Sequence, residues 1–369
     1  DMPFRYEQNV ESEDGNNVYL TIDETIQSIC EKYMQKGVED NNVLNKGVCI
    51  AMNVNTGAIL AMVTTDGYDL NNPYELSAKD KKKIKSTAKS KQAEAESAAL
   101  SNMWRNKAVA DTYMPGSVFK MCVASAALEE NLVNEKTSFT CTGSISVEGE
   151  TIHCSNISGH GTQNFVEAIS NSCNPAFIQI GQMLGAGKFR QYYQGFGFSD
   201  KTGIDLPGEA DDEFWAEGKM GGVDLAVASF GQNFAITPIQ MITACAAVSN
   251  GGYVVQPHVV SKITDSKGNV IKSVDKKVKR QVISDDTSKK MKEYLEYNTE
   301  RQGAAAGYIS GYKVAGKSGT TEKRGVTKFE SSFSEDYISS FCGYAPADDP
   351  QIAMLVFFDT PDGDAYYGS

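Results

Sequence analysis

The stretch GYKVAGKSGT, residues 311–320, matches two sequence patterns that require different folds. As G-x-x-x-x-G-K-S it fits a phosphate-binding loop, in which a helix must begin at the Lys-Ser pair so that backbone N–H groups meet the phosphates. As K-S-G-T, from Lys317 to Thr320, it fits a strand motif that accompanies a nucleophilic serine. The residues around the stretch must decide between a helix and a strand.

The segment that follows Thr320 favours the strand. It reads TEKRGVTKFESSFSED, with mostly polar side chains and no apolar spacing of period 3.6, so no helix is predicted there. The segment IAMLVFFD, residues 352–359, imitates the second strand of a nucleotide-binding site, but an apolar strand ending in Asp is common in sheets of every kind. A P-loop nucleotide-binding protein, with its loop at 311–318, therefore stays only as the minor alternative.

Two further motifs precede K-S-G-T in the chain order that a serine nucleophile of this kind requires. Ser117 and Lys120 lie three residues apart at the start of a predicted helix, in PGSVFKMCVASAAL, so they share one helix face. Ser172 and Asn174 form an S-x-N motif directly after another helical segment. Each motif alone occurs often by chance. The three together and in order are specific.

The chemistry of a serine nucleophile assigns a role to each motif. A serine hydroxyl must lose its proton to a base as it attacks, and with three histidines and no G-x-S-x-G elbow a Ser-His-Asp triad has little support. We expect Lys120 to be the base for Ser117, its pKa lowered by burial and by Lys317 across the cleft. Ser172 would relay a proton to a leaving amine, and Asn174 would bind a substrate amide.

The K-S-G-T strand is the predicted substrate-binding edge. Ser318 and Thr320 offer hydroxyl groups to a substrate carboxylate, and Lys317 offers a positive charge. Gly319 lies between the two hydroxyl residues. Backbone N–H groups of Ser117 and Thr320 would hold an oxyanion. A local positive charge is needed because the formal net charge of the chain is -12, which also excludes nucleic acid as the main partner.

Apolar segments that flank turn residues predict strands at both ends of the chain. VYLTID, residues 18–23, is followed by an amphipathic helix up to Gly37, and then two strands flank a tight turn at 55–57. A second hairpin is predicted around the PADDP turn near the far end. We expect an α/β (α+β) fold, with an antiparallel sheet built from both chain ends, flanked by helices, and an inserted, mostly helical lobe. Residues 1–16 are the predicted linker and 17–369 the catalytic domain.

Three other features bear on the organisation of the chain. Residues 70–106 become polar and lysine-rich, which predicts a solvated, partly helical excursion. No run of 18 apolar residues exists. Five of the eight cysteines sit singly in apolar surroundings and are predicted to be buried hydrophobes: Cys30, Cys49, Cys122, Cys245 and Cys342.

With these motifs in place, almost the whole chain resembles the penicillin-binding proteins, in particular the transpeptidase domain of the class B, monofunctional type. The blocks that carry the resemblance are VYLTIDETIQ, GAILAM, WRNKAVADTYMPGSVFK, GHGTQN, FGFSDKTGIDLPGE and SFGQNFAITPIQM. It implies that Ser117 is acylated by peptidoglycan stem peptides ending in D-Ala-D-Ala, with loss of the last residue, before a neighbouring stem's amine takes the acyl group. Beta-lactam antibiotics would imitate the first step. Ser318 departs from the threonine more usual in the family but keeps the hydroxyl.

The resemblance also implies a cellular setting. Such a domain faces outward from the bacterial cell membrane, carries an anchor helix and a pedestal region before residue 1, and works with a membrane cell-wall polymerase. The block GIDLPGE is more similar to the division and sporulation branch than to the elongation branch.

Four residues around the S-x-N motif form a candidate metal site: Cys141, Cys154, His160 and Cys173. Three thiolates and an imidazole make a tetrahedral zinc set, and some class B relatives hold zinc at positions that resemble these, with carboxylates in place of some of the thiols. With four protein ligands the ion would be structural, and no catalytic cofactor is expected. A Cys141–Cys154 disulfide and reduced thiols are the alternatives, and His153 is a substitute ligand.

Other functions fit the same three motifs. A beta-lactamase or beta-lactam sensor would share them, but no E-x-x-L-N deacylation element is present. A D,D-carboxypeptidase would use water in place of the acceptor amine. A non-catalytic scaffold is disfavoured by the intact Ser117 and Lys120.

Overall fold

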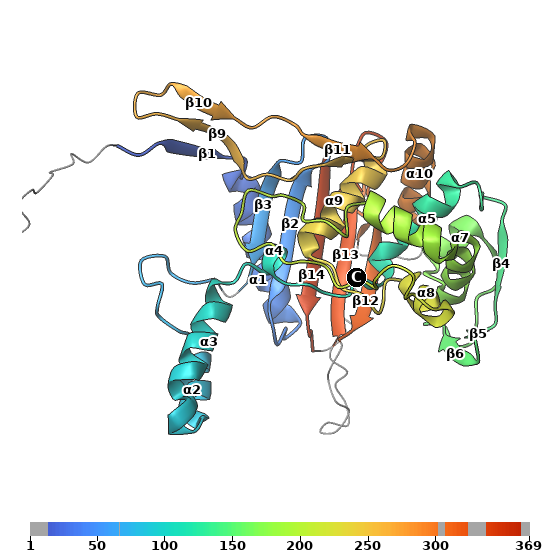
Figure 1. Cartoon of the computed structure of the whole chain (residues 1–369), viewed down its shortest axis with the longest axis horizontal. Helices are drawn as coiled ribbons and strands as arrows, with labels where there is room; N and C mark the ends of the chain where they lie inside the picture. Colours follow the sequence, from blue (N-terminus) through green and yellow to red (C-terminus); the bar gives the residue numbers. More distant parts are fainter. Residues whose placement is uncertain (1–13, 66, 302–306, 324–336, 363–369) are drawn as a thin grey trace, which may run out of the picture.

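A five-stranded antiparallel sheet forms the centre of the computed structural model, which describes residues 14–65, 67–301, 307–323 and 337–362 (Figure 1). Its strand order is β12-β13-β14-β2-β3. The bounds are β2 Gly47–Asn53, β3 Ile59–Thr64, β12 Ala315–Glu322, β13 Tyr337–Ala345 and β14 Ile352–Asp359. Both predicted hairpins are present, and β14 pairs with β2 in the register Leu355↔Ile50. The prediction of a sheet built from both chain ends is confirmed.

The alternation of side chains along β14 gives the sheet two apolar faces. Ala353, Leu355 and Phe357 enter the main core, whereas Met354 and Phe358 pack in a smaller cluster on the other face. Helix α1, Glu24–Asp40, covers the smaller cluster, and its predicted start is confirmed because Asp23 accepts a hydrogen bond from the backbone N–H of Ile26 at 2.9 Å. The site lies on the main-core side.

The inserted lobe holds the helices that surround the main core (Figure 1). They are α4 Lys107–Ala110, the 3₁₀ turn η2 Gly116–Phe119, α5 Lys120–Glu129, α6 Phe165–Ser170, α7 Asn174–Gly195, α8 Gly222–Ala228, α9 Pro238–Ser249 and α10 Asp285–Arg301. Helix α9 is buried along its whole length, against β2, β13 and β14. A helix that is apolar on every side belongs in the middle of a core, and α9 has that place.

Short strand pairs lie outside the central sheet. They are β4 Ser138–Cys141 with β7 Gly161–Asn164, β5 Ser144–Val147 with β6 Glu150–His153, β8 Tyr253–Val255 with β11 Val278–Gln281, and β9 Val260–Thr264 with β10 Val270–Ser273. Strand β1, Asn17–Leu20, pairs with β9. The predicted strand at 18–23 therefore exists but does not extend the central sheet.

The lysine-rich excursion is a pair of helices, α2 Ala78–Ser86 and α3 Gln92–Trp104, joined by the short turn η1 Lys89–Lys91. It projects from the body of the molecule, and its lysines are exposed (Figure 1). The prediction of a solvated, partly helical segment is confirmed. Of the predicted linker, residues 1–13 lie outside the described residues, and no described helix has the length and apolarity needed to cross a membrane.

All eight cysteines are buried free thiols, as predicted for the five in apolar surroundings. None of the five is solitary, because Cys122, Cys245 and Cys342 lie near one another in the main core and the other two form a pair. Cys30 on α1 and Cys49 on β2 lie in the same small cluster, where the Cys30 thiol and burial raise the pKa of Cys49 above its ordinary value.

Gly37 does not end α1, as its sequence position predicted, but lies inside the helix. A β-carbon built on Gly37 would overlap the ring of Phe358, and one on Gly47 would come within 3.1 Å of the same ring. The ring is therefore held between two glycines, and α1 can approach the sheet only because position 37 has no side chain.

Replacing Gly37 by alanine tests this close approach. Helix propensity alone would stabilise Gly37→Ala by about 1 kcal/mol, but the methyl group must displace a ring that has no room, at a cost of about 1–3 kcal/mol. We expect a net loss of stability, measured as a lower midpoint of denaturant unfolding. Gly187→Ala in α7 is the control, because nothing lies within 4 Å of its β-carbon position, and it should raise the midpoint. Equal rises in both variants would contradict the proposed packing.

Candidate active site

Ser117 lies half-buried in η2, between the end of an extended segment and α5. The helix proper begins at Lys120, after the 3₁₀ turn, and the backbone N–H of Lys120 still bonds to the carbonyl of Ser117. Gly116 has φ +58, and a β-carbon there would overlap Thr321 Oγ1. The N–H of Gly116 donates to Gly231 O at 2.8 Å. Gly116 therefore allows β12 to lie directly against the serine turn.

Lys120 is fully buried, and its Nζ has three hydrogen-bond acceptors. It donates to Ser172 O at 2.7 Å, Ser172 Oγ at 3.1 Å and Asn174 Oδ1 at 2.7 Å. The Phe177 ring lies 5.3 Å from Nζ. Burial, with the charge of Lys317 as a second cause, holds the pKa of Lys120 well below its usual value. A lysine in this state can exist as a neutral amine and accept a proton.

The S-x-N motif lies between two helices. Ser172 follows α6 with φ +50, a conformation in which non-glycine residues are uncommon, and Asn174 is the first residue of α7. Asn174 Nδ2 donates to His153 O at 3.3 Å, which ties the motif to the end of β6. With this backbone, both the carbonyl and the hydroxyl of Ser172 face the Nζ of Lys120.

Strand β12 carries the third motif along the serine turn. Lys317 is 1% exposed, its Nζ donates to Ser318 O at 3.0 Å, and burial lowers its pKa to about 8. A β-carbon on Gly319 would lie 3.1 Å from the backbone N of Val118, and one on Gly116 would lie 3.1 Å from Thr320 O. The structure thus brings all three motifs together. The P-loop alternative is wrong, because residues 315–322 form a continuous strand and no helix begins at Lys317 and Ser318.

The four candidate metal ligands also converge. The ligand atoms of Cys141, Cys154, His160 and Cys173 all lie within 4.8 Å of one another, and Cys154 Sγ is 3.6 Å from His160 Nδ1. A hydrogen bond from Cys173 lowers the pKa of Cys154 to about 4, helped by two backbone N–H groups and by His160. Cys141 and Cys154 are not bridged. His153 is not a member of the group and contributes only its carbonyl to Asn174.

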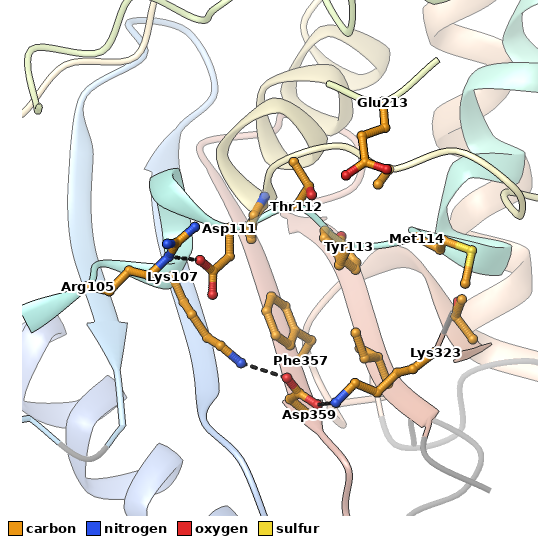
Figure 2. A pocket seen from close by; sticks show the side chains of 14 residues that line it. Arg105, Lys107, Asp111, Thr112, Tyr113, Met114, Glu213, Lys323, Phe357 and Asp359 are labelled. Atoms are coloured by element: carbon orange, nitrogen blue, oxygen red, sulfur yellow. Dashed lines mark hydrogen bonds and ion pairs between the residues drawn. The ribbon is translucent and has the colours of Figure 1, made fainter. Parts of the chain in front are cut away.

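One charged group of the site was missed by sequence reasoning. Asp359 at the end of β14 is 7% exposed and accepts from Lys107 Nζ at 2.6 Å and from Lys323 Nζ at 2.7 Å (Figure 2). Burial alone would raise the pKa of Asp359, but the two ammonium groups outweigh it and hold the pKa below its ordinary value. No local signal joins residues 107 and 359, which are 252 positions apart.

Comparison with known proteins gives consistent matches. A family model described as the penicillin binding protein transpeptidase domain matches residues 47–369. Stage V sporulation protein D of Bacillus subtilis (strain 168) is 33% identical over 369 residues, covering 100% of this chain and 53% of that protein. Peptidoglycan D,D-transpeptidase FtsI of Buchnera aphidicola subsp. Schizaphis graminum (strain Sg) is 26% identical, covering 98% and 57%. The chain spans about half the length of these curated relatives.

Solved structures agree on the fold. The D,D-transpeptidase domain of a peptidoglycan glycosyltransferase from Eggerthella lenta superposes with a TM-score of 0.78 at 26% identity, covering 96% of this chain and 81% of that chain. Penicillin binding protein 3 from Mycobacterium tuberculosis gives a TM-score of 0.82 at 23% identity, covering 98% and 77%, and shares the fold. The sporulation relative agrees with the branch expected from the GIDLPGE block. The chain belongs to the penicillin-binding protein transpeptidase domain family.

Proposed function

We propose that this chain cross-links peptidoglycan stem peptides as a D,D-transpeptidase, through an acyl-enzyme on Ser117. The observation that carries the proposal is the buried Lys120, one turn from Ser117, with its Nζ between Ser172 and Asn174 and a depressed pKa. The relatives named above as D,D-transpeptidases support the reaction type.

The first step releases the terminal D-alanine. Ser117 Oγ attacks the carbonyl carbon of the penultimate D-alanine and gives its proton to the neutral amine of Lys120. The carbon–nitrogen bond then breaks, and Ser172 Oγ passes a proton from Lys120 to the departing amine. An ester to Ser117 is left, and the hydrogen bond between Lys120 Nζ and Ser172 Oγ, at 3.1 Å, supports this relay.

The second step uses the same groups in reverse. The amine of a second stem peptide attacks the ester carbonyl and loses a proton toward Lys120, the ester bond breaks, and Ser117 Oγ regains a proton. In both steps the oxyanion would be held by the backbone N–H groups of Ser117 and Thr320, which the close approach of β12 to the serine turn supports. The terminal carboxylate of the donor would be bound by Lys317, Ser318 and Thr320, with Gly319 lying between the two hydroxyl residues.

Water in place of the second amine would make the chain a carboxypeptidase, and rapid hydrolysis of the ester would make it a beta-lactamase. The names of the relatives favour transfer over hydrolysis. A non-catalytic scaffold has no need to bury a lysine with three acceptors. We therefore favour the transpeptidase, acting on the extracytoplasmic side of the membrane where its polymer is found, with a membrane cell-wall polymerase of division or sporulation as its partner.

We also propose a structural zinc ion at Cys141, Cys154, His160 and Cys173. Three thiols and an imidazole, with ligand atoms within 4.8 Å of one another, suit a tetrahedral ion with metal–sulfur bonds of about 2.3 Å. When bound, the ion would fix the loop from which Ser172 and Asn174 project, because Cys173 lies between them. All four coordination positions would be taken by protein, so no step of the reaction uses it.

Mass spectrometry of the intact chain tests the nucleophile. Incubation with benzylpenicillin should add the mass of one intact penicillin, since ring opening by Ser117 loses no atoms. Ser117→Ala should show no adduct and keep the wild-type melting temperature, because the half-buried hydroxyl is not part of the core. An adduct that persists in Ser117→Ala would contradict the assignment.

The pH dependence of acylation tests the carboxylate site. The pKa of Lys317 is lowered to about 8, so its charge is present below that pH and is lost as the pH rises through it. The methyl ester of benzylpenicillin lacks the carboxylate that Lys317 would bind. The acylation rate constant for benzylpenicillin, divided by the acylation rate constant for this ester, should therefore fall as the pH rises through about 8. The ester is the control for every effect that acts through Lys120. A ratio that does not change with pH would exclude charge recognition by Lys317.

Metal analysis tests the zinc proposal. The purified chain should contain about one zinc ion per molecule, and a chelator should lower its melting temperature and its rate of acylation by penicillin together. Cys154→Ser should lose the metal, whereas Cys30→Ala, at a cysteine outside the four ligands, should retain it. The zinc proposal would be wrong if the native chain had the mass of the metal-free protein and if a chelator left its melting temperature unchanged.

A further inference from the structure

A lysine-rich arm projects from the body of the molecule and has no part in the steps above (Figure 1). The arm consists of α2, η1 and α3 and spans residues 78–104. It contains seven lysines and three acidic side chains, in a chain whose formal net charge is -12. The lysines all lie in α2 and η1: Lys79, Lys81, Lys82, Lys83, Lys85, Lys89 and Lys91. The arm is therefore a positive region on an acidic protein.

The base of the arm is fixed to the body. Trp104 Nε1, at the end of α3, donates to Pro73 O at 2.6 Å, and the Tyr74 ring meets the Trp104 ring edge-on at 5.5 Å between centroids. Lys46 Nζ, just before β2, donates to Asn102 O at 3.1 Å. These contacts join the end of α3 to the segment before α2 and to the central sheet, so the arm has a defined direction.

The tip of the arm is electrostatically separate from the acidic body. Helix α3 has thirteen residues, so at 1.5 Å per residue its two ends lie about 20 Å apart. Charges separated by more than about 8 Å are largely screened at physiological salt. An anion that approaches η1 and the end of α2 meets the lysines there before it meets the negative charge of the body.

Most of these lysines have no partner in the protein. All seven side chains are exposed. Lys81 pairs with Glu75 at 3.3 Å, and Lys79 donates to Leu44 O at 3.5 Å. Within the residues that the structure describes, the other five ammonium groups make no hydrogen bond or ion pair. Like charges three and four residues apart on a helix repel each other, and a bound polyanion would relieve that repulsion.

The arrangement of the lysines favours a flexible polymer over a flat surface. At 3.6 residues per turn, Lys79 and Lys83 share one side of α2, whereas Lys81 and Lys85 lie on nearly the opposite side. A membrane surface reaches only one side of such a helix, and a helix that lies in a membrane needs an apolar face. The only large apolar side chain of α2 and η1 is Ile84, which is half-buried. A linear polymer can wrap around the arm and contact every side.

We propose that this arm is a docking site for a linear phosphodiester polymer of the cell wall, one that carries a negative charge on each short polyol unit. Lysines three and four positions apart have β-carbons about 5–6 Å apart, so closely spaced phosphates along the polymer meet successive ammonium groups. The arm contains no arginine, which excludes bidentate recognition and leaves the binding to charge and spacing.

The docking site goes beyond the proposed cross-linking reaction and uses only its proposed extracytoplasmic location. The arm follows β3, which is at the opposite edge of the central sheet from β12. A polymer bound to the arm leaves Ser117 accessible to stem peptides and keeps the domain next to the wall on which it acts.

Binding of fluorescently labelled poly(glycerol phosphate) to the whole chain tests the site. The wild-type chain should bind it saturably, with an affinity that falls as the salt concentration rises, because each lysine–phosphate contact releases a counterion. Lys82→Gln, Lys83→Gln and Lys85→Gln, made together, should weaken the binding roughly tenfold at about 0.15 M salt. They should also reduce the slope of log affinity against log salt by about one to two.

The matched control replaces three exposed lysines on and beside β10 by glutamine: Lys267, Lys272 and Lys276. It changes the net charge by the same amount and should keep the wild-type affinity. Equal weakening in the two triple variants, or no saturable binding by the wild-type chain, would overturn the docking site. Tighter binding to phosphatidylglycerol vesicles than to the polymer would overturn the polymer as the occupant in favour of a membrane.

Penicillin labelling distinguishes this proposal from the proposed function. Both triple variants should label at Ser117 at the wild-type rate, which also shows that they are folded. Normal labelling without polymer binding overturns the docking site alone, whereas normal polymer binding without labelling of the wild-type chain overturns the proposed function alone.

Discussion

The burial of one lysine amine organises this active site. An ammonium group removed from water must be given hydrogen-bond acceptors, and a lost partner at such a depth costs about 1–3 kcal/mol or more. Lys120 has three, and they come from the short connection between α6 and α7. The connection can supply them because Ser172 adopts a left-handed backbone that turns its carbonyl and hydroxyl to the same side. The need for acceptors around a buried lysine amine thus determines the conformation of the S-x-N motif.

The same requirement explains why the sheet is assembled from distant parts of the chain. Strand β12 must lie beside the serine turn to complete the site, yet Lys317 is 200 positions from Ser117 in sequence. The pairing of β14 with β2 joins the two ends, and the pairing of β12 with β13 then places Lys317 next to Lys120. Burial lowers the pKa of both lysines, and the charge of Lys317 lowers the pKa of Lys120 further, which suits Lys120 to accept a proton.

Much of this could be predicted from sequence because the relevant signals are local. Each of the three motifs occupies only a few residues, and the apolar runs of β2, β3 and β14 are bounded by turn residues. What could not be predicted depends on packing. Gly37 looks like a helix end, since nothing local reveals that Phe358 fills the space beside it. Asp359 looks like an unremarkable strand end, and only the folded chain brings Lys107 and Lys323 to it.

The contact between β12 and the serine turn also limits how this chain can vary. Gly116 and Gly231 meet so closely that a β-carbon on Gly231 would overlap the carbonyl of Gly116, and both have positive φ. A side chain at Gly116 would separate β12 from Ser117, and a side chain at Gly231, which follows α8, would displace the serine turn itself. Substitutions that preserve the geometry around Ser117 must therefore arise at positions where a larger side chain has room. Substitution is therefore most restricted where the serine turn meets β12 and the segment after α8.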